Sequence, residues 1–416
     1  MVFKRYYNLF YFLLFAVSAC GMISCKSVAN SDITPIESNR DVMYVDLDHA
    51  KKCDKVLYSS FLDKPRTILL ETTERCVVRE ITALDVYKHK IYILDGEMNR
   101  LYVFDMNGKY LYNIGKLGKG HGEYLTISDF SIDRKNNVVY VWDESQGAAL
   151  RFNLATRQFE KLVRVAKNGD EKYCMQYYDG FLYLNRASFS SGDGDYLLEK
   201  VDTASGICIA KYLEASRYNK GWDYPLRQDH SCFYSRNTDN PKFFEMFSDT
   251  IVTFSKKGIY PYVALTSDKF VTNADVTEFK QAHSEKDMNH DIQYFMNKGL
   301  TFFPSSYVEN KHSVWMNIMM GNNLNYLFYD KENKSAVLTE VFTNDYICKN
   351  FNMPLEMPYY SEKGVMCIIR PAFMPYFVKD VIQTGKLNKS IDGYSQLNKL
   401  SANSNPVLFF HKFKAR

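Results

Sequence analysis

A self-similarity at a spacing of 48 residues constrains this chain more than any other feature. The stretch 91–114, IYILDGEMNRLYVFDMNGKYLYNI, aligns without a gap with 139–162, VYVWDESQGAALRFNLATRQFEKL. Each copy reads as an apolar strand ending in Asp, a turn, an alternating strand, a second turn and a third strand. One more strand, at 81–87 or 127–133, precedes each copy. Four short antiparallel strands repeated at this length are typical of a β-propeller blade.

Weaker copies continue the pattern along the chain. Residues 177–213, 243–265 and 312–341 each contain strands separated by polar turns, and 364–371 begins a last unit. Residues 65–73 precede the first full unit, and we expect them to supply a strand that closes the ring with strands from the C-terminal end. The sequence therefore predicts an all-β protein, a β-propeller of four-stranded antiparallel blades.

Two segments depart from the strand pattern. Residues 273–299 are polar with apolar residues at helical spacing, which predicts a small helical insertion between blades, capped by Asn273 or Asp275. Residues 373–385 predict a short helix near the C-terminus.

A glycine-dense run, GKLGKGHGEY, occupies residues 115–124. A loop that grips phosphate needs a strand before it and a helix after it. Here the spacing fits neither G-x-G-x-x-G nor the Walker pattern, no Ser or Thr follows the Gly-Lys pair, and the next residues read as strands. We therefore expect a sharp crossing between two blades, where glycine permits positive φ and close backbone approach.

The same run carries a family resemblance. Ile114-Gly115 and the stretch from Gly118 through His121 to Tyr124, within residues 85–153, resemble the six-bladed β-propeller lipoproteins of Gram-negative gut anaerobes, which are similar to NHL-type propellers. Members usually have Pro where this chain has His121. The resemblance implies six blades, with seven as the alternative, and a place in the cell envelope; it implies little about activity.

The N-terminus, MVFKRYYNLFYFLLFAVSAC, predicts a lipoprotein signal peptide at 1–19. A basic start precedes about a dozen mostly apolar residues, which suits a signal peptide and is shorter than the roughly 20 residues of a membrane span. Val17-Ser18-Ala19-Cys20 resembles the bacterial lipoprotein box, in which the cysteine is acylated, and Cys25 is the alternative.

This reading divides the rest of the chain in two. We expect a flexible tether over 20–45, because that stretch is polar without a strong element, and a propeller domain over 46–416. The lipid would attach the protein to the outer membrane, on its periplasmic or cell-surface face.

Seven cysteines remain beyond the two lipidation candidates: Cys53, Cys76, Cys174, Cys208, Cys232, Cys348 and Cys367. None forms a C-x-x-C pair, and none has a histidine at zinc-finger spacing, so we expect no metal site. The sequence predicts buried free thiols, with one or two bridges possible in an exported protein.

Charge and motifs narrow the function. The net charge is only +4 without a basic stripe, which argues against a nucleic-acid partner. The sequence contains no G-x-S-x-G, H-E-x-x-H or EF-hand pattern, so it predicts no catalytic residue and no cofactor. Asp95 and Asp143 end equivalent strands, and we expect their carboxylates to accept backbone N–H groups in the following turn.

Two places are candidates for a ligand surface. His121 lies in the glycine-dense run, and the aromatic, polar stretch 218–237 contains Trp222, Tyr224 and Arg227. The predicted function is a non-catalytic binding or scaffold module for a glycan, a peptide or a partner protein. The alternatives are a propeller lyase or hydrolase with its site at the central channel, and an envelope assembly or sensing component.

Overall fold

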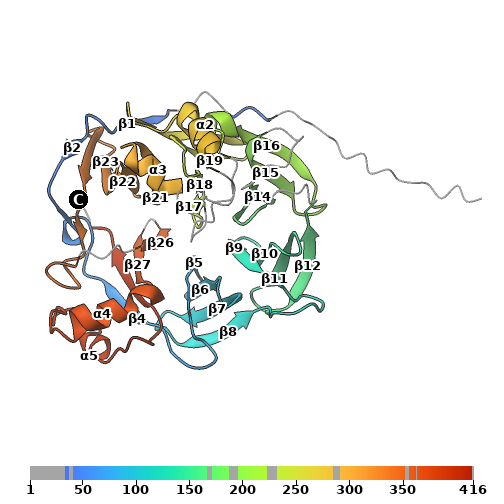
Figure 1. Cartoon of the computed structure of the whole chain (residues 1–416). Helices are drawn as coiled ribbons and strands as arrows, with labels where there is room; N and C mark the ends of the chain where they lie inside the picture. Colours follow the sequence, from blue (N-terminus) through green and yellow to red (C-terminus); the bar gives the residue numbers. More distant parts are fainter. Residues whose placement is uncertain are drawn as a thin grey trace, which may run out of the picture. The chain divides into compact units, whose positions relative to one another are not determined.

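The computed structural model describes residues 33–36, 41–165, 171–186, 195–222, 232–283, 291–351, 356–361 and 363–414. Asp32–Arg416 form one compact unit. Within this unit six small antiparallel sheets stand around a ring, as Figure 1 shows. The predicted all-β fold, a six-bladed β-propeller, is confirmed, and the seven-bladed alternative is wrong.

The first three blades follow one another along the chain, each with its innermost strand first. Blade 1 comprises β5 (Ala83–Tyr87), β6 (Lys90–Asp95), β7 (Arg100–Asp105) and β8 (Tyr110–Ile114). Blade 2 comprises β9 (Ile127–Asp133), β10 (Val138–Asp143), β11 (Ala148–Asn153) and β12 (Phe159–Arg164). Blade 3 comprises β13 (Met175–Tyr178), β14 (Phe181–Asn185), β15 (Tyr196–Asp202) and β16 (Cys208–Glu214).

The last three blades combine strands from both ends of the chain. Blade 4 comprises β17 (Phe233–Tyr234), β18 (Lys242–Phe243), β19 (Thr250–Phe254), β20 (Ile259–Thr266) and β1 (Met43–Asp46). Blade 5 comprises β21 (Thr301–Glu309), β22 (Ser313–Met320), β23 (Asn323–Asp330), β24 (Ser335–Thr339) and β2 (Lys51–Lys52). Blade 6 comprises β26 (Glu356–Ser361), β27 (Gly364–Ile369), β28 (Val407–Lys412) and β4 (Arg66–Leu69).

The N-terminal segment therefore lines the outer edges of successive blades, and we call residues 43–69 the belt. β1 runs parallel to β20, β2 runs parallel to β24, and β3 (Val56–Leu57) runs parallel to the short strand β25 (Phe342–Thr343). β4 pairs antiparallel with β28, which confirms the predicted closure of the ring by a strand within 65–73.

Because of the belt, the propeller domain begins earlier in the sequence than expected. β1 begins at Met43, ahead of the boundary expected at residue 46. Farther upstream, the Thr34 N–H donates to the Lys211 carbonyl of β16 over 2.7 Å. The reason is the free edge of each outermost strand, whose unpaired backbone groups bind an extended segment.

Packing between neighbouring sheets forms the core. In β10 all six residues, VVYVWD, are buried, because both faces of the sheet are covered by adjacent blades. Between blades 1 and 2 the contacts join Val103 and Ile114 to Phe130 and Val141 in one apolar cluster.

The predicted helical insertion near 273–299 is also confirmed. It contains α2 (Asn273–Ala282) and α3 (Asp291–Asn297), which precede β21 and follow β20. The predicted cap was wrong: the N-cap of α2 is Thr272, and not Asn273 or Asp275. Thr272 and Asp275, the third residue of the helix, exchange hydrogen bonds in a capping box.

The remaining helical elements are short: η1 (Tyr58–Ser60), α1 (Ala215–Tyr218), η3 (Pro371–Phe373), α4 (Met374–Phe377), η4 (Val378–Ile382) and α5 (Tyr394–Leu397). α4 and η4 confirm the short helix predicted within 373–385, and they lie beside blade 6 in Figure 1.

Candidate functional site

The glycine-rich loop, residues 115–126, connects the outermost strand of blade 1 to the innermost strand of blade 2. Gly115 has φ +63°, and a Cβ there would come within 2.7 Å of the Tyr124 ring. Gly122 has φ +74°, and a Cβ there would meet Phe159 at 2.7 Å. The loop leads directly into β9, which is a strand, so the predicted crossing between blades is confirmed.

The loop is closed by its own carboxylate. Glu123 accepts a hydrogen bond from the Gly120 N–H over 2.7 Å and forms an ion pair with Lys116, also over 2.7 Å. The hydrogen bond from Lys116, followed by that from the Gly120 amide, lowers the pKa of Glu123. An anionic side chain of the protein therefore occupies the position next to the loop amide that a phosphate would need.

A hollow of about 270 Å³ opens beside this loop. His121 is exposed at its edge, and its ring packs edge-to-face on Phe159 with the centroids 4.8 Å apart. The remaining lining comes from β11, β12 and the turn before β11, including Gln146, Glu160 and Lys161. The volume is close to the roughly 300 Å³ at which binding pockets for small molecules begin.

The polar groups of the hollow are held in fixed positions. Gln146 donates to the Glu123 carbonyl over 3.1 Å and to Asp143 over 2.8 Å. Glu160 accepts hydrogen bonds from Arg151 and from Asn153, and Lys161 donates to the Thr203 carbonyl over 2.7 Å. The hollow thus presents donors, acceptors and an aromatic surface, which is the mixture that recognises neutral polar ligands.

The carboxylates at the ends of the second strands have a structural role, as predicted. Asp95 accepts the Arg79 N–H over 2.7 Å and the Met98 N–H over 3.0 Å. Asp143 accepts the Leu125 N–H over 2.7 Å and the Gln146 N–H over 3.1 Å. Each side chain therefore joins the loop that enters its blade to the turn that follows its own strand.

The innermost strands carry an arginine–carboxylate pair that the sequence did not reveal. Arg236, after β17 of blade 4, forms an ion pair of 2.7 Å with Asp129 of blade 2, whose side chain is 1% exposed. Its guanidinium also donates to Gln176 and to the Met175 carbonyl of blade 3. Burial raises the pKa of Asp129, and the guanidinium of Arg236 opposes that shift.

A second ion pair lies nearby in the chain's first two blades. Arg134, after β9, contacts both carboxylate oxygens of Asp85 in β5, at 2.6 and 2.7 Å. Asp85 and Asp129, on the innermost strands of blades 1 and 2, are therefore each paired with an arginine. No local motif marks these arginines, because their partners lie 49 and 107 residues away.

Trp222 lies away from this site. Its side chain is 3% exposed and packs against Phe247, Phe279 and Phe295, so it fixes the helical insertion to the core. The structure thus gives Trp222 a packing role and does not bring it together with His121. Tyr224 and Arg227 lie outside the described residues.

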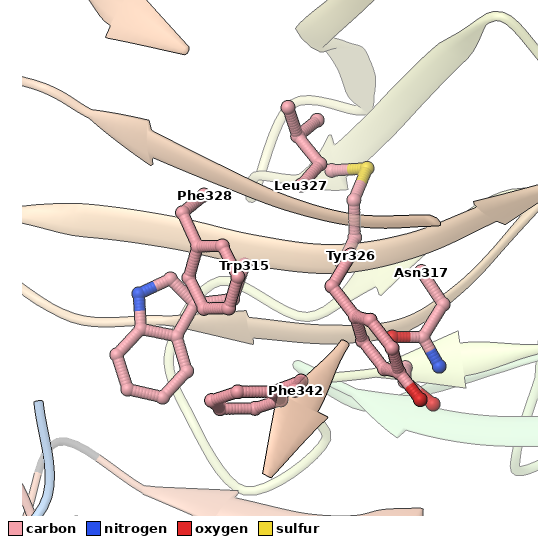
Figure 2. A pocket seen from close by; sticks show the side chains of 8 residues that line it. Trp315, Asn317, Tyr326, Leu327, Phe328 and Phe342 are labelled. Atoms are coloured by element: carbon pink, nitrogen blue, oxygen red, sulfur yellow. The ribbon is translucent and has the colours of Figure 1, made fainter. Parts of the chain in front are cut away.

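A second cavity, lined by aromatic side chains of blade 5, is shown in Figure 2. The rings of Trp315, Phe328 and Phe342 lie on one side, and Tyr326 and Asn317 lie on the other. Its volume of about 20 Å³ admits one water molecule. This cavity belongs to the aromatic core of the blade and is too small for a ligand.

Among the residues that the structure describes, no three His, Cys, Asp or Glu side chains are grouped so that they could hold a metal ion. Within the same residues, no helix has the length and apolar character needed to cross a bilayer.

Comparisons with known proteins agree with the architecture. Residues 43–412 match the model of a family described as a domain of unknown function, DUF4934. The chain is similar to the crystal structure of a Bacteroides fragilis NCTC 9343 protein provisionally named as exported, with a TM-score of 0.68 and 16% identity over 90% of this chain and 100% of that chain. At this identity the similarity shows a shared fold.

Two further structures are more distant. One is a DUF4221-family protein of Bacteroides vulgatus ATCC 8482, with a TM-score of 0.48 and 8% identity over 85% of this chain and 97% of that chain. The other is the structure of the WD40 repeats of RRP9, with a TM-score of 0.43 and 10% identity over 85% of this chain and 100% of that chain. No curated protein matches the sequence.

Proposed function

The chain belongs to the family of the domain of unknown function DUF4934, and from this membership we propose that it is an exported, non-catalytic propeller that binds a glycan segment. The proposed site is the hollow beside the glycine-rich loop, where His121, Phe159 and Glu160 line the opening. Its volume of about 270 Å³ is large enough to hold one sugar ring of a longer chain.

The observation that carries this proposal is the chemistry of the lining. Sugars present hydroxyl groups to hydrogen-bonding side chains and C–H faces to aromatic rings. The hollow offers both, with the amide of Gln146 and the carboxylate of Glu160 near the ring of Phe159. The hydrogen bonds to Asp143 and Arg151 hold these two polar groups in place before a ligand arrives, which limits the entropy lost on binding.

The non-catalytic role is supported by the pairing of two carboxylates on the innermost strands. Asp85 and Asp129 are both bound by arginines, which keeps them from acting as a free acid and base. A lyase or hydrolase at the channel would need an available pair of such groups.

We further propose a lipid anchor at Cys20, with Cys25 as the alternative, on an NHL-like propeller of the outer membrane. The support is the lipoprotein-box resemblance and the structural similarity to a protein provisionally named as exported. Residues 1–19 would be removed, and the tether would run from residue 20 toward Thr34, whose N–H donates to the Lys211 carbonyl of β16. Mass spectrometry of the N-terminal peptide tests this anchor: acylation is expected in the parent and in Cys25→Ala, and it should be lost in Cys20→Ala.

The binding proposal can be tested with residues 26–416, because Asp32–Arg416 form one compact unit. Thermal unfolding is followed during titration with glycans, peptides and divalent metal ions. A glycan should raise Tm with its concentration, since a ligand of the native state stabilises it by mass action.

Variants locate the site. His121→Ala and Glu160→Gln should each weaken glycan binding roughly fivefold or more, which corresponds to about 1 kcal/mol. His49→Ala is the matched control, because His49 is an exposed histidine far from the hollow in sequence, and its ring contacts Asp46. A shift in Tm caused only by peptides, or a glycan affinity unchanged in both hollow variants, would contradict the proposal.

A further inference from the structure

Two thiols meet where blades 3 and 4 face each other. Cys174 immediately precedes β13, and Cys232 immediately precedes β17, which are the innermost strands of their blades. Both side chains are buried, at 1% and 0% exposure. The Cys232 N–H donates to the Cys174 sulfur over 3.0 Å.

The geometry of this contact is compatible with a covalent bond. Standard bond lengths on either side of the N–H···S contact keep the two Cα atoms within roughly 7 Å, and disulfides span Cα separations up to about 6.8 Å. Cys174 is itself held in place, because its N–H donates to the Asn185 side chain over 2.8 Å. Rotation about the two Cα–Cβ bonds, which sets the positions of the sulfurs, can therefore bring them together without a rearrangement of the blades.

We propose that Cys174 and Cys232 form a disulfide that joins the inner strands of blades 3 and 4. The proposal rests on the proposed export, because disulfides persist in oxidising compartments. In the reaction each thiol loses its proton, an Sγ–Sγ bond forms, and two electrons pass to an acceptor disulfide, which is reduced to two thiols. The acceptor is a disulfide-bearing oxidoreductase or a small-molecule disulfide.

The burial of the two thiols determines whether the disulfide forms before or after folding. Burial raises the pKa of both thiols, and the thiolate is the reactive species, so the folded protein reacts slowly. The neighbouring carboxyl of Glu245 is also buried. The bond should therefore form before blades 3 and 4 close on each other.

Other cysteines have different partners. Cys76 donates to the Glu71 carbonyl over 3.1 Å, and Cys208 donates to the Ala210 carbonyl over 3.4 Å. Cys208→Ala therefore serves as a matched control that removes a thiol and leaves the proposed pair intact.

The first experiment tests the geometry without reference to export. Residues 26–416 are reduced, unfolded and refolded with glutathione and glutathione disulfide, and free thiols are then alkylated. The expected product carries two fewer alkyl groups than the fully reduced protein, has a disulfide mass about 2 Da below the dithiol, and yields one linked peptide containing Cys174 and Cys232. Cys208→Ala should form the same link, and Cys232→Ala should not.

The bridged protein should also unfold at a higher temperature. The bond closes a long loop between positions 58 residues apart, and we expect a Tm about 5 °C above that of the reduced form. Refolded protein that leaves Cys174 and Cys232 alkylated, or that links other cysteines instead, would overturn the proposal.

The second experiment tests the bond in cells. The full chain is recovered from the envelope fraction and alkylated under denaturing conditions before reduction. A Cys174–Cys232 link supports the proposal, and free thiols at both positions in envelope protein overturn it. Failure of export is distinguishable, since the protein would then be missing from the envelope while the refolding experiment still gives the link; glycan titration tests the hollow separately.

Discussion

Single polar side chains fix the path of the backbone between blades. Asp95, Asp143 and Asn185 stand at the ends of the second strands of blades 1, 2 and 3, and each accepts backbone N–H groups from the segment that enters its blade. The 48-residue alignment placed Asp95 opposite Asp143, so this role could be predicted from the sequence. The equivalent role of Asn185 was not predicted, because the third copy of the repeat aligns less closely with the first two.

Replacement of one such acceptor should be costly. Asp143→Ala leaves the N–H groups of Leu125 and Gln146 without their acceptor, and we expect a loss of about 3 kcal/mol in the free energy of unfolding, measured by urea denaturation. Asp105→Ala is the control, because Asp105 accepts N–H groups in an exposed turn; its loss should be about 1 kcal/mol or less. Equal losses in the two variants would argue against the role of Asp143.

Glu245 should make the stability depend on pH. Burial raises the pKa of its carboxyl to about 8, from 4.5 in an unfolded chain. The folded protein therefore binds the proton more tightly, and this contribution is full below pH 4.5 and is lost as the pH rises through 8, by up to roughly 5 kcal/mol.

The isosteric variant Glu245→Gln cannot ionise. Its free energy of unfolding, measured in urea between pH 5 and pH 9, should fall less steeply with pH than that of the parent. Parallel pH profiles for the two proteins would contradict the assignment.

At the scale of elements, the belt determines which sheet edges remain open. β1 and β2 add a fifth strand to blades 4 and 5, and β4 completes blade 6. The repeat predicted the four-stranded blades, because sheets buried on both faces need apolar strands at the same positions of every unit. It missed β1 and β2 because these strands are short and lie outside the repeat, so only their pairing with distant strands defines them.

Two adjacent residues of β1 allow the contribution of side-chain packing to be measured apart from that of backbone strand pairing. Val45 is 1% exposed in the cluster that joins blades 4 and 5, whereas its neighbour Tyr44 is 70% exposed. Val45→Ala should lower the free energy of unfolding by about 2 kcal/mol, and Tyr44→Ala should change it by about 0.5 kcal/mol or less. Urea denaturation monitored by tryptophan fluorescence measures both. A larger loss for Tyr44→Ala would mean that β1 is held by its exposed face.

Across the whole molecule, Arg236 connects three blades around the channel. It extends from blade 4 to Asp129 of blade 2 and to backbone and side-chain acceptors of blade 3. The overall ring and its closure could be predicted from the repeat, with the number of blades supplied by the family resemblance. The contact between Arg236 and Asp129 could not be predicted, because a contact between residues 107 positions apart leaves no periodic pattern in one sequence.

Removal of this arginine should weaken the entire ring. Arg236→Ala leaves Asp129 buried without its ion-pair partner, and we expect a loss of about 3–5 kcal/mol, visible as a lower Tm and a lower urea midpoint. Arg134→Ala is the matched variant: its side chain is 29% exposed, so the expected loss is about 1 kcal/mol. A smaller loss for Arg236→Ala than for Arg134→Ala would show that the channel pair is dispensable.

The position of the belt also sets an order of events during synthesis. β1 to β4 leave the ribosome early, but their partners β20, β24, β25 and β28 lie in the second half of the chain and are translated much later. At roughly 5–20 residues per second, β4 waits tens of seconds for β28. A nascent chain can assemble blades 1 to 3 from neighbouring residues during that time, yet β4 cannot pair until β28 has been translated.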